Sequence, residues 1–139
     1  MKSLDEYLRD AEQAHGHLCA GQVLGVRMAM LGLQKLGNGD PRGKDCKRLI
    51  TFVEIDRCAT DAVAVVTGCR LGKRALKFRD WGKVAATFVD VSSGRAIRVA
   101  AKESSKMLAR QMHPELADKN QQQMLAYGEI SEDDLFTTH

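Results

Sequence analysis

The segment from residue 22 to residue 36 is apolar on nearly every face of the helix that it can form. Its apolar residues include Val23, Leu24, Val26, Met28, Ala29, Met30, Leu31 and Leu33. A helix that is apolar all round is buried, whereas a surface helix keeps one polar face. The sequence therefore predicts a central helix packed on several sides. It ends at the Gly-Asn-Gly-Asp-Pro run of residues 37–41, since these residue types interrupt helices.

Helices and short strands are predicted around this segment from their hydrophobic periodicity. A helix over residues 3–14 has Ser3 as its cap and Glu6 as the capping-box partner. Strands are expected at 49–55, 75–78, 84–91 and 96–100, and the 79–83 link has the length of a hairpin and contains a glycine. Residues 59–67 favour a short buried helix, with a strand as the alternative. Helices at 103–110 and 114–127 and a capped turn at 130–136 complete the chain.

This order of elements favours an α+β fold in one domain over residues 1–139. We expect N-terminal helices, a mostly antiparallel sheet of about four strands, and C-terminal helices. No apolar run approaches the roughly 18 residues that span a bilayer, and the charged first ten residues do not resemble a signal peptide. A cytoplasmic location is therefore expected. In that reducing compartment the four cysteines are metal ligands, reactive thiols or core residues rather than disulfides.

Three side chains that bind transition metals lie within five residues of each other: His15, His17 and Cys19. Imidazole and thiolate suit zinc, copper, iron or nickel, and they exclude magnesium and calcium as the natural ion. His17 and Cys19 point in different directions on a regular helix, so they can share one ion only where the backbone is irregular. Gly16 and Gly21 permit such a backbone. The expected cofactor is one transition-metal ion, zinc by preference, with nickel or iron as alternatives.

A local pair is too few for a tetrahedral site, so further ligands must come from elsewhere in the chain. Cys58 is the obvious distant donor, because it follows a predicted strand and precedes a predicted helix. A thiolate at a helix N-terminus is stabilised by free N–H groups and by the helix dipole. Cys69 is a further candidate, although a single buried cysteine is usually a core residue.

Two motifs of this sequence resemble the FmdE-like family, which is named after the E subunit of formylmethanofuran dehydrogenase. They are His15-Gly16-His17-Leu18-Cys19-Ala20-Gly21 with Gly25, and Asp56-Arg57-Cys58-Ala59-Thr60-Asp61-Ala62 followed by Gly68-Cys69 and Gly72-Lys73. The resemblance implies an α+β domain, often dimeric, with a metal held by His17, Cys19 and Cys58 and with His15 and Asp56 nearby. Many family members continue into a C-terminal zinc ribbon, but no cysteine follows Cys69 here, so the ribbon's function is not expected.

Basic residues concentrate between positions 70 and 83, namely Arg70, Lys73, Arg74, Lys77, Arg79 and Lys83. A solvated surface explains such a run, and the alternative is an anion site at Arg70 and Lys73. The segment does not have P-loop spacing. The net charge of +3 and the scarcity of aromatic residues argue against nucleic-acid binding.

Three functions remain open from the sequence. The first is a non-catalytic metal-binding accessory or sensor protein, which the FmdE resemblance links to a larger oxidoreductase complex of one-carbon, molybdenum or tungsten metabolism. The second is a metal-dependent enzyme acting on a small anionic substrate, with His15, Asp56 or Asp61 as general base. The third is a thiol redox protein that uses Cys19, Cys58 or Cys69. A homodimer is also predicted, because so apolar a central helix needs extensive cover.

Overall fold

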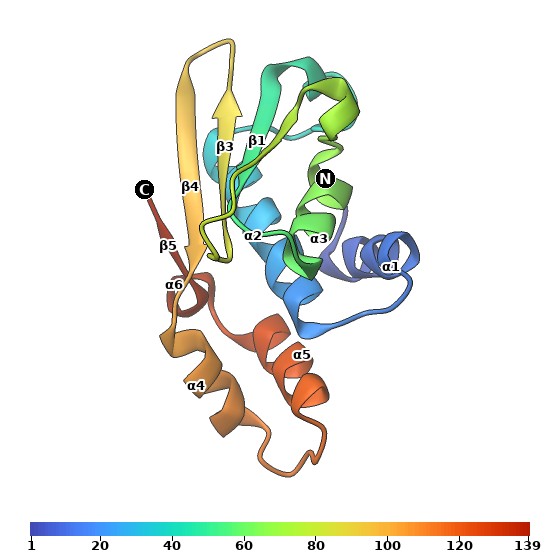
Figure 1. Ribbon diagram of the computed structural model, residues 1–139. Helices are drawn as coiled ribbons and strands as arrows, with labels where there is room; N and C mark the ends of the chain where they lie inside the picture. The colour runs from blue at the N-terminus through green and yellow to red at the C-terminus, as the bar shows by residue number, and fades with distance from the viewer.

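A five-stranded mixed sheet and six α-helices form the fold of residues 1–139 in a computed structural model (Figure 1). This arrangement confirms the α+β prediction, with helices at both ends of the chain. The elements in chain order are α1 (Leu4–His15), α2 (Ala20–Leu36), β1 (Leu49–Val53), α3 (Cys58–Thr67), β2 (Leu76–Phe78), β3 (Ala85–Asp90), β4 (Arg95–Ala101), α4 (Ser104–Met112), α5 (Lys119–Glu129), α6 (Glu132–Leu135) and β5 (Phe136–Thr138).

The strands are ordered β2-β1-β3-β4-β5 across the sheet. The pairs β1–β3, β3–β4 and β4–β5 are antiparallel, while β1 and β2 are parallel. The hairpin expected between β2 and β3 is therefore wrong. The 79–83 link instead runs past the end of β1, where the backbone N–H groups of Trp81 and Lys83 donate to the carbonyl of Glu54. This crossing carries the chain to the opposite edge of β1.

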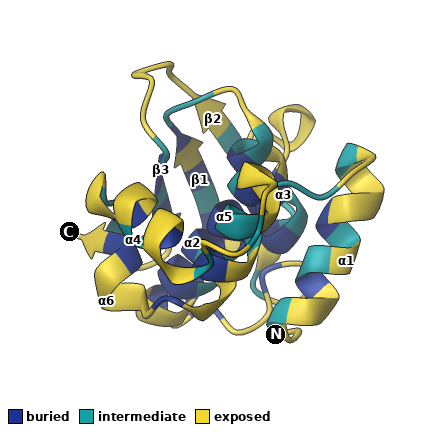
Figure 2. Ribbon diagram, turned by 90° about the horizontal axis from the view of Figure 1, so that it is seen from below, coloured by how far each residue is buried: buried dark blue, intermediate teal, exposed yellow.

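The central helix α2 is buried between α3, the sheet and α5, as its apolar sequence predicts (Figure 2). Val26, Ala29 and Leu33 are fully buried in this core. All of this cover comes from one chain. The apolar character of α2 therefore does not by itself require a second copy, and the homodimer stays a prediction.

Two glycines let α2 approach its neighbours more closely than any other residue type would. A Cβ atom added at Gly25 would lie 2.4 Å from the carbonyl oxygen of Ala59, in α3. A Cβ atom added at Gly32 would lie 2.2 Å from the ring of Phe88, in β3. The glycines thus set the distance from α2 to α3 and to the sheet.

The C-terminal helices differ from their predicted bounds. Helix α5 begins at Lys119 rather than at residue 114, because the Asp118 side chain caps it by accepting from the N–H of Asn120. Strand β5 was not predicted, since its three residues are too few for a periodic signal. Arg27 of α2 fixes the end of α5 by donating to the carbonyls of Tyr127 and Ile130. None of the helices has the length and apolar character needed to cross a bilayer.

The ion pair between Glu54 and Arg98 gives a pH-dependent contribution to stability. Arg98 donates two hydrogen bonds to the carboxylate, at 2.8 and 2.9 Å, and holds the pKa of Glu54 below its ordinary value. A lowered pKa stabilises the fold above the unfolded-state pKa, and this contribution is lost as the pH falls through the folded-state pKa. We expect Arg98→Gln to lower the free energy of unfolding by roughly 1 kcal/mol at pH 7.

Urea unfolding at neutral and acidic pH checks this prediction. The difference between Arg98→Gln and the unmodified protein should shrink once Glu54 protonates. Arg95→Gln is the matched control, because Arg95 lies on the same strand and its side chain donates only to the carbonyl of Lys35. If the loss of unfolding free energy in Arg98→Gln were the same at neutral and acidic pH, the ion pair with Glu54 would not be its cause.

Candidate metal centre

Two helix N-termini bring the predicted cysteines together. Cys19 is the N-cap residue of α2, and Cys58 is the first residue of α3. Gly21 fits between them, since a Cβ atom added there would lie 3.4 Å from Cβ of Cys58 and 4.0 Å from Sγ of Cys19. The fold therefore places the distant cysteine next to the local motif.

His15 reaches the same point from the end of α1. Its Nε2 lies 3.3 Å from Sγ of Cys58, and its Nδ1 lies 2.7 Å from the carboxylate of Asp61. A carboxylate accepts a hydrogen bond from the Nδ1–H group of an imidazole. The Nε2 atom of that imidazole then carries no hydrogen, and its lone pair faces the thiol. Asp61 lies in the first turn of α3, so one short helix supplies both the thiol and the group that orients the imidazole.

His17 lies beside His15, with 4.9 Å between the ring centroids. Helix α1 ends at Gly16, whose φ of 98° is in the left-handed region that favours glycine. Residues 16–18 then leave the helical conformation before α2 begins at Ala20. The irregular backbone predicted between His15 and Cys19 is thus present. His17, within this irregular stretch, is exposed.

Burial raises the pKa of the Cys58 thiol, and the neighbouring Cys19 thiol raises it further. A thiol that keeps its proton is a weak nucleophile and a weak reductant. A metal ion would have to displace this proton, which is the usual linkage between metal binding and pH. All four cysteines are free.

The donor set suits a transition metal, although its side chains are not assembled into a coordination sphere. No three side chains among the histidines, cysteines and acids are grouped as a metal site requires. Zinc bonds of about 2.3 Å to sulfur and 2.0–2.1 Å to nitrogen, at a tetrahedral angle, separate the two donors by roughly 3.6 Å. The observed 3.3 Å between Cys58 and His15 is close to this value. Small side-chain movements would admit an ion there.

A cavity of about 530 Å³ opens beside Cys58 and His15. One wall is apolar and consists of Val53, Leu71, Leu76 and Phe78, and the polar residues around it are Asp56, Arg57, Thr60 and Asp61. No sequence pattern reveals the apolar wall, because its residues come from β1, β2 and the turn before β2. Asp56, a predicted neighbour of the metal, lines this cavity.

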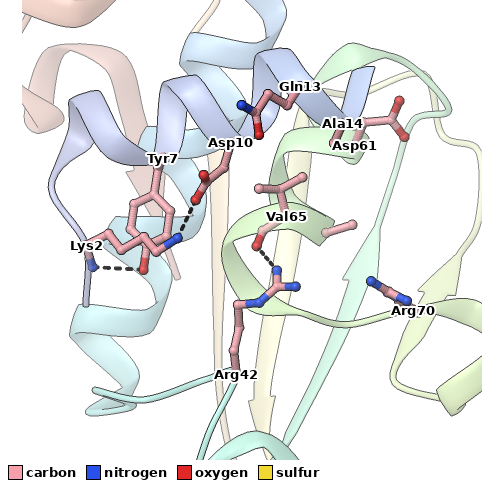
Figure 3. A pocket seen from close by; sticks show the side chains of 10 residues that line it. Lys2, Tyr7, Asp10, Gln13, Ala14, Arg42, Asp61, Val65 and Arg70 are labelled. Carbon is pink, nitrogen blue, oxygen red and sulfur yellow. Dashed lines mark hydrogen bonds and ion pairs between the residues drawn. The ribbon is translucent and has the colours of Figure 1, made fainter. Parts of the chain in front are cut away.

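Three other predicted residues lie away from the cluster. Cys69 is buried beside Thr51, whose hydroxyl lies 3.4 Å from its sulfur, so it serves as a core residue. Arg70 and Lys73 line two different cavities. Arg70 faces a cavity that it shares with Asp61 and with Arg42, whose guanidinium donates to the carbonyl of Val65 (Figure 3). The sequence gives no sign of Arg42, which comes from the turn after α2.

Residues 14–137 match the profile of the family described as "FmdE, Molybdenum formylmethanofuran dehydrogenase operon". The chain belongs to the FmdE family. The match spans both motifs, from His15 to Gly21 and from Asp56 to Ala62, and so confirms the resemblance seen in the sequence.

Two known proteins are similar to this FmdE-family chain. One is a solved structure from Syntrophus aciditrophicus, a protein like the E subunit (FmdE) of tungsten formylmethanofuran dehydrogenase, with a TM-score of 0.73 and 21% identity. The alignment covers 99% of this chain and 71% of that one, and it shows a shared fold. The other is a probable S-adenosyl-L-methionine-binding protein from Archaeoglobus fulgidus, 38% identical over 97 residues. That match covers 69% of this chain but only 26% of the relative.

Proposed function

We propose that this FmdE-family protein binds one transition-metal ion, with zinc expected, between the N-termini of α2 and α3. Cys19 and Cys58 would supply sulfur, and His15 and His17 would supply nitrogen. The observation that carries the proposal is the contact of Cys58 with His15 at 3.3 Å, with Asp61 behind the imidazole. Carboxylate–histidine pairs of this kind orient the histidine ligands of many metal sites.

The role proposed for this centre is that of an accessory protein. The family description refers to a molybdenum formylmethanofuran dehydrogenase operon, and the Syntrophus protein is described as similar to one subunit of a tungsten formylmethanofuran dehydrogenase. A site with four protein ligands is typical of structural or carrier roles, in which the ion has no open position for substrate. We infer a cytoplasmic protein that acts beside a larger oxidoreductase, as a homodimer.

The cavity beside Cys58 favours a second candidate function, an enzyme for a small anionic substrate. If one histidine left the ion, an open position would supply Lewis-acid chemistry. Arg57 lines the cavity and carries the charge that an anionic substrate needs, while Asp56, Asp61 and His15 are its candidate bases. The name of the archaeal relative suggests S-adenosylmethionine, a sulfonium cation rather than an anion, as a separate small molecule to test in this cavity.

Elemental analysis of freshly purified protein tests the metal proposal. We expect about one metal ion per chain, and its loss in both Cys19→Ser and Cys58→Ser. Cys46→Ser is the matched control, because Cys46 is a free and exposed cysteine outside the site. Full metal occupancy in both site variants would contradict the assignment. His15→Ala and His17→Ala then report which imidazole binds.

Replacing Asp61 by asparagine should weaken metal binding without removing a ligand. The loss of a carboxylate that orients a ligand typically costs 10–100-fold in affinity. We expect roughly tenfold here, since the side chain of Asp61 is 59% exposed. Competition with a chromophoric chelator measures the affinity. Asp10→Asn is the control, because Asp10 pairs with Lys2 rather than with a site residue, and an equal change in both variants would contradict the role of Asp61.

A further inference from the structure

A further cavity, of about 670 Å³, lies where the end of β4 leads into α4. Its volume is in the range of small-molecule sites. The walls come from several separate elements and loops, so no sequence pattern reveals it. The lining residues that matter for binding are Arg57, Lys83, Lys106, Ser105, Val84 and Tyr127.

Three cations in this cavity have no partner. The side chains of Arg57, Lys83 and Lys106 make none of the hydrogen bonds or ion pairs of the structure. The other two cations of the lining are engaged, since Arg98 pairs with Glu54 and Lys102 donates to the carbonyl of Asp133.

The lining also contains three acidic residues, Asp56, Asp80 and Glu103, against five basic ones. Asp80 accepts from the backbone N–H of Gly82, and neither Asp56 nor Glu103 forms an ion pair. Five basic residues less three acidic ones leave an excess of two positive charges in the lining, which favours an anionic ligand.

The floor of the cavity is polar and its walls are partly apolar. Ser105 and Tyr127 are buried, with 1% and 3% exposure, and their side chains lie next to each other. Leu24, Ile55 and Val84 supply apolar surface. Helix α4 begins at the same wall, but its N-cap residue is the acidic Glu103, and the N–H groups of Ser105 and Lys106 already donate to the carbonyls of Lys102 and Glu103. An anion in this cavity would therefore contact the basic side chains rather than the start of the helix. The cavity thus combines a surface for an apolar or aromatic group with a set of basic side chains.

We propose that this cavity binds a phosphorylated small molecule of nucleotide size. Its phosphates would lie among Arg57, Lys83 and Lys106, and the rest of the molecule would contact the apolar wall. These three basic residues come from three separate segments of the chain, and the several oxygens of a phosphate or diphosphate can bind more than one of them at once.

The proposed site is separate from the metal centre. Cys19, Cys58 and His15 do not line it. Asp56 and Arg57 line both this cavity and the one beside Cys58, so the two cavities lie on either side of one short loop. Failure of the metal proposal would therefore leave the phosphate site intact.

Calorimetry gives a direct readout of binding. Calorimetric titrations with pyrophosphate and with ADP should both show saturable binding. The fluorescence of Trp81 is a second readout, because Trp81 lies between Asp80 and Gly82, which both line the cavity. We expect the double variant Lys83→Ala/Lys106→Ala to raise both dissociation constants at least tenfold. Circular dichroism confirms that the variant is folded.

Two controls separate binding in this cavity from a general charge effect and from phosphate held by a metal ion. Lys35→Ala/Lys44→Ala removes the same charge from exposed positions outside the cavity, and it should leave binding unchanged. Cys58→Ser should also retain binding, since a metal-bound phosphate would be lost with the metal. Absence of saturable binding to both probes, or equal losses in the two lysine double variants, would overturn the proposal. So would loss of binding in Cys58→Ser.

Discussion

Gly25→Ala is expected to destabilise the fold and to weaken metal binding at the same time. The added Cβ would lie 2.4 Å from the carbonyl oxygen of Ala59 and 2.9 Å from Cβ of Ala62. The nearest obstruction is backbone, so α3 itself must move away from α2. Overpacking of this kind costs about 1–3 kcal/mol. Because Cys58 begins α3 and Cys19 caps α2, the same movement separates the two thiols.

The matched control for Gly25→Ala is Gly128→Ala. Gly128 lies in α5, and a Cβ atom added there meets nothing within 4 Å. Alanine has the higher helix propensity by about 1 kcal/mol, so this variant should be neutral or more stable. Urea unfolding and chelator competition measure both effects. A Gly25→Ala protein with unchanged stability and unchanged metal affinity would show that the close contact of α2 and α3 is not required.

Phe88→Ala should cause the largest loss of stability, about 3–5 kcal/mol. Phe88 is fully buried in β3, and its ring lies against Gly32 of α2. Gly32→Ala alone should also be destabilising, since the added methyl group would meet the ring at 2.2 Å. Combined with Phe88→Ala, the same methyl group enters the space that the ring has left. We therefore expect Gly32→Ala to be much less harmful, or stabilising, in that background.

A double-mutant cycle measured by urea unfolding tests this coupling. Coupling between contacting residues amounts to about 0.5–3 kcal/mol. Additive effects of the two substitutions would contradict the contact between Gly32 and Phe88. Ile97→Val on β4 is the control substitution for the cycle. Ile97 pairs with Phe88 in the sheet, but the three atoms nearest to a Cβ added at Gly32 all belong to Phe88.

The elements that the sequence predicts well are those with a local signal. The apolar stretch of α2, the Ser3–Glu6 capping box and the glycine after α1 each act within a few residues, and each appears in the structure. The parallel pairing of β2 with β1 has no such signal. It depends on hydrogen bonds from the 79–83 link to the end of β1, which join residues far apart in the chain.

The candidate site shows the same division. The sequence predicts Cys19 from its closeness to two histidines, and Cys58 from its position between a predicted strand and a predicted helix. The family resemblance implies His17 as a ligand with His15 nearby, whereas the structure places His15 against Cys58. The carboxylate of Asp61 contacts His15 across the gap between α1 and α3, and spacing in the sequence does not reveal this contact. The cavities have no local pattern in the sequence, since their walls come from unrelated segments.

The contact between the N-termini of α2 and α3 has a consequence for how long the protein lasts in the cell. A metal shared by Cys19 and Cys58 would close a loop of chain that contains the whole of α2 and β1. Such a closure lowers the entropy of the unfolded chain, as a cross-link does. A bound ligand stabilises the native state by an amount that grows with the logarithm of the ratio of free ligand concentration to dissociation constant. The turnover of this protein would then follow the supply of metal, and the folded population would report on metal availability.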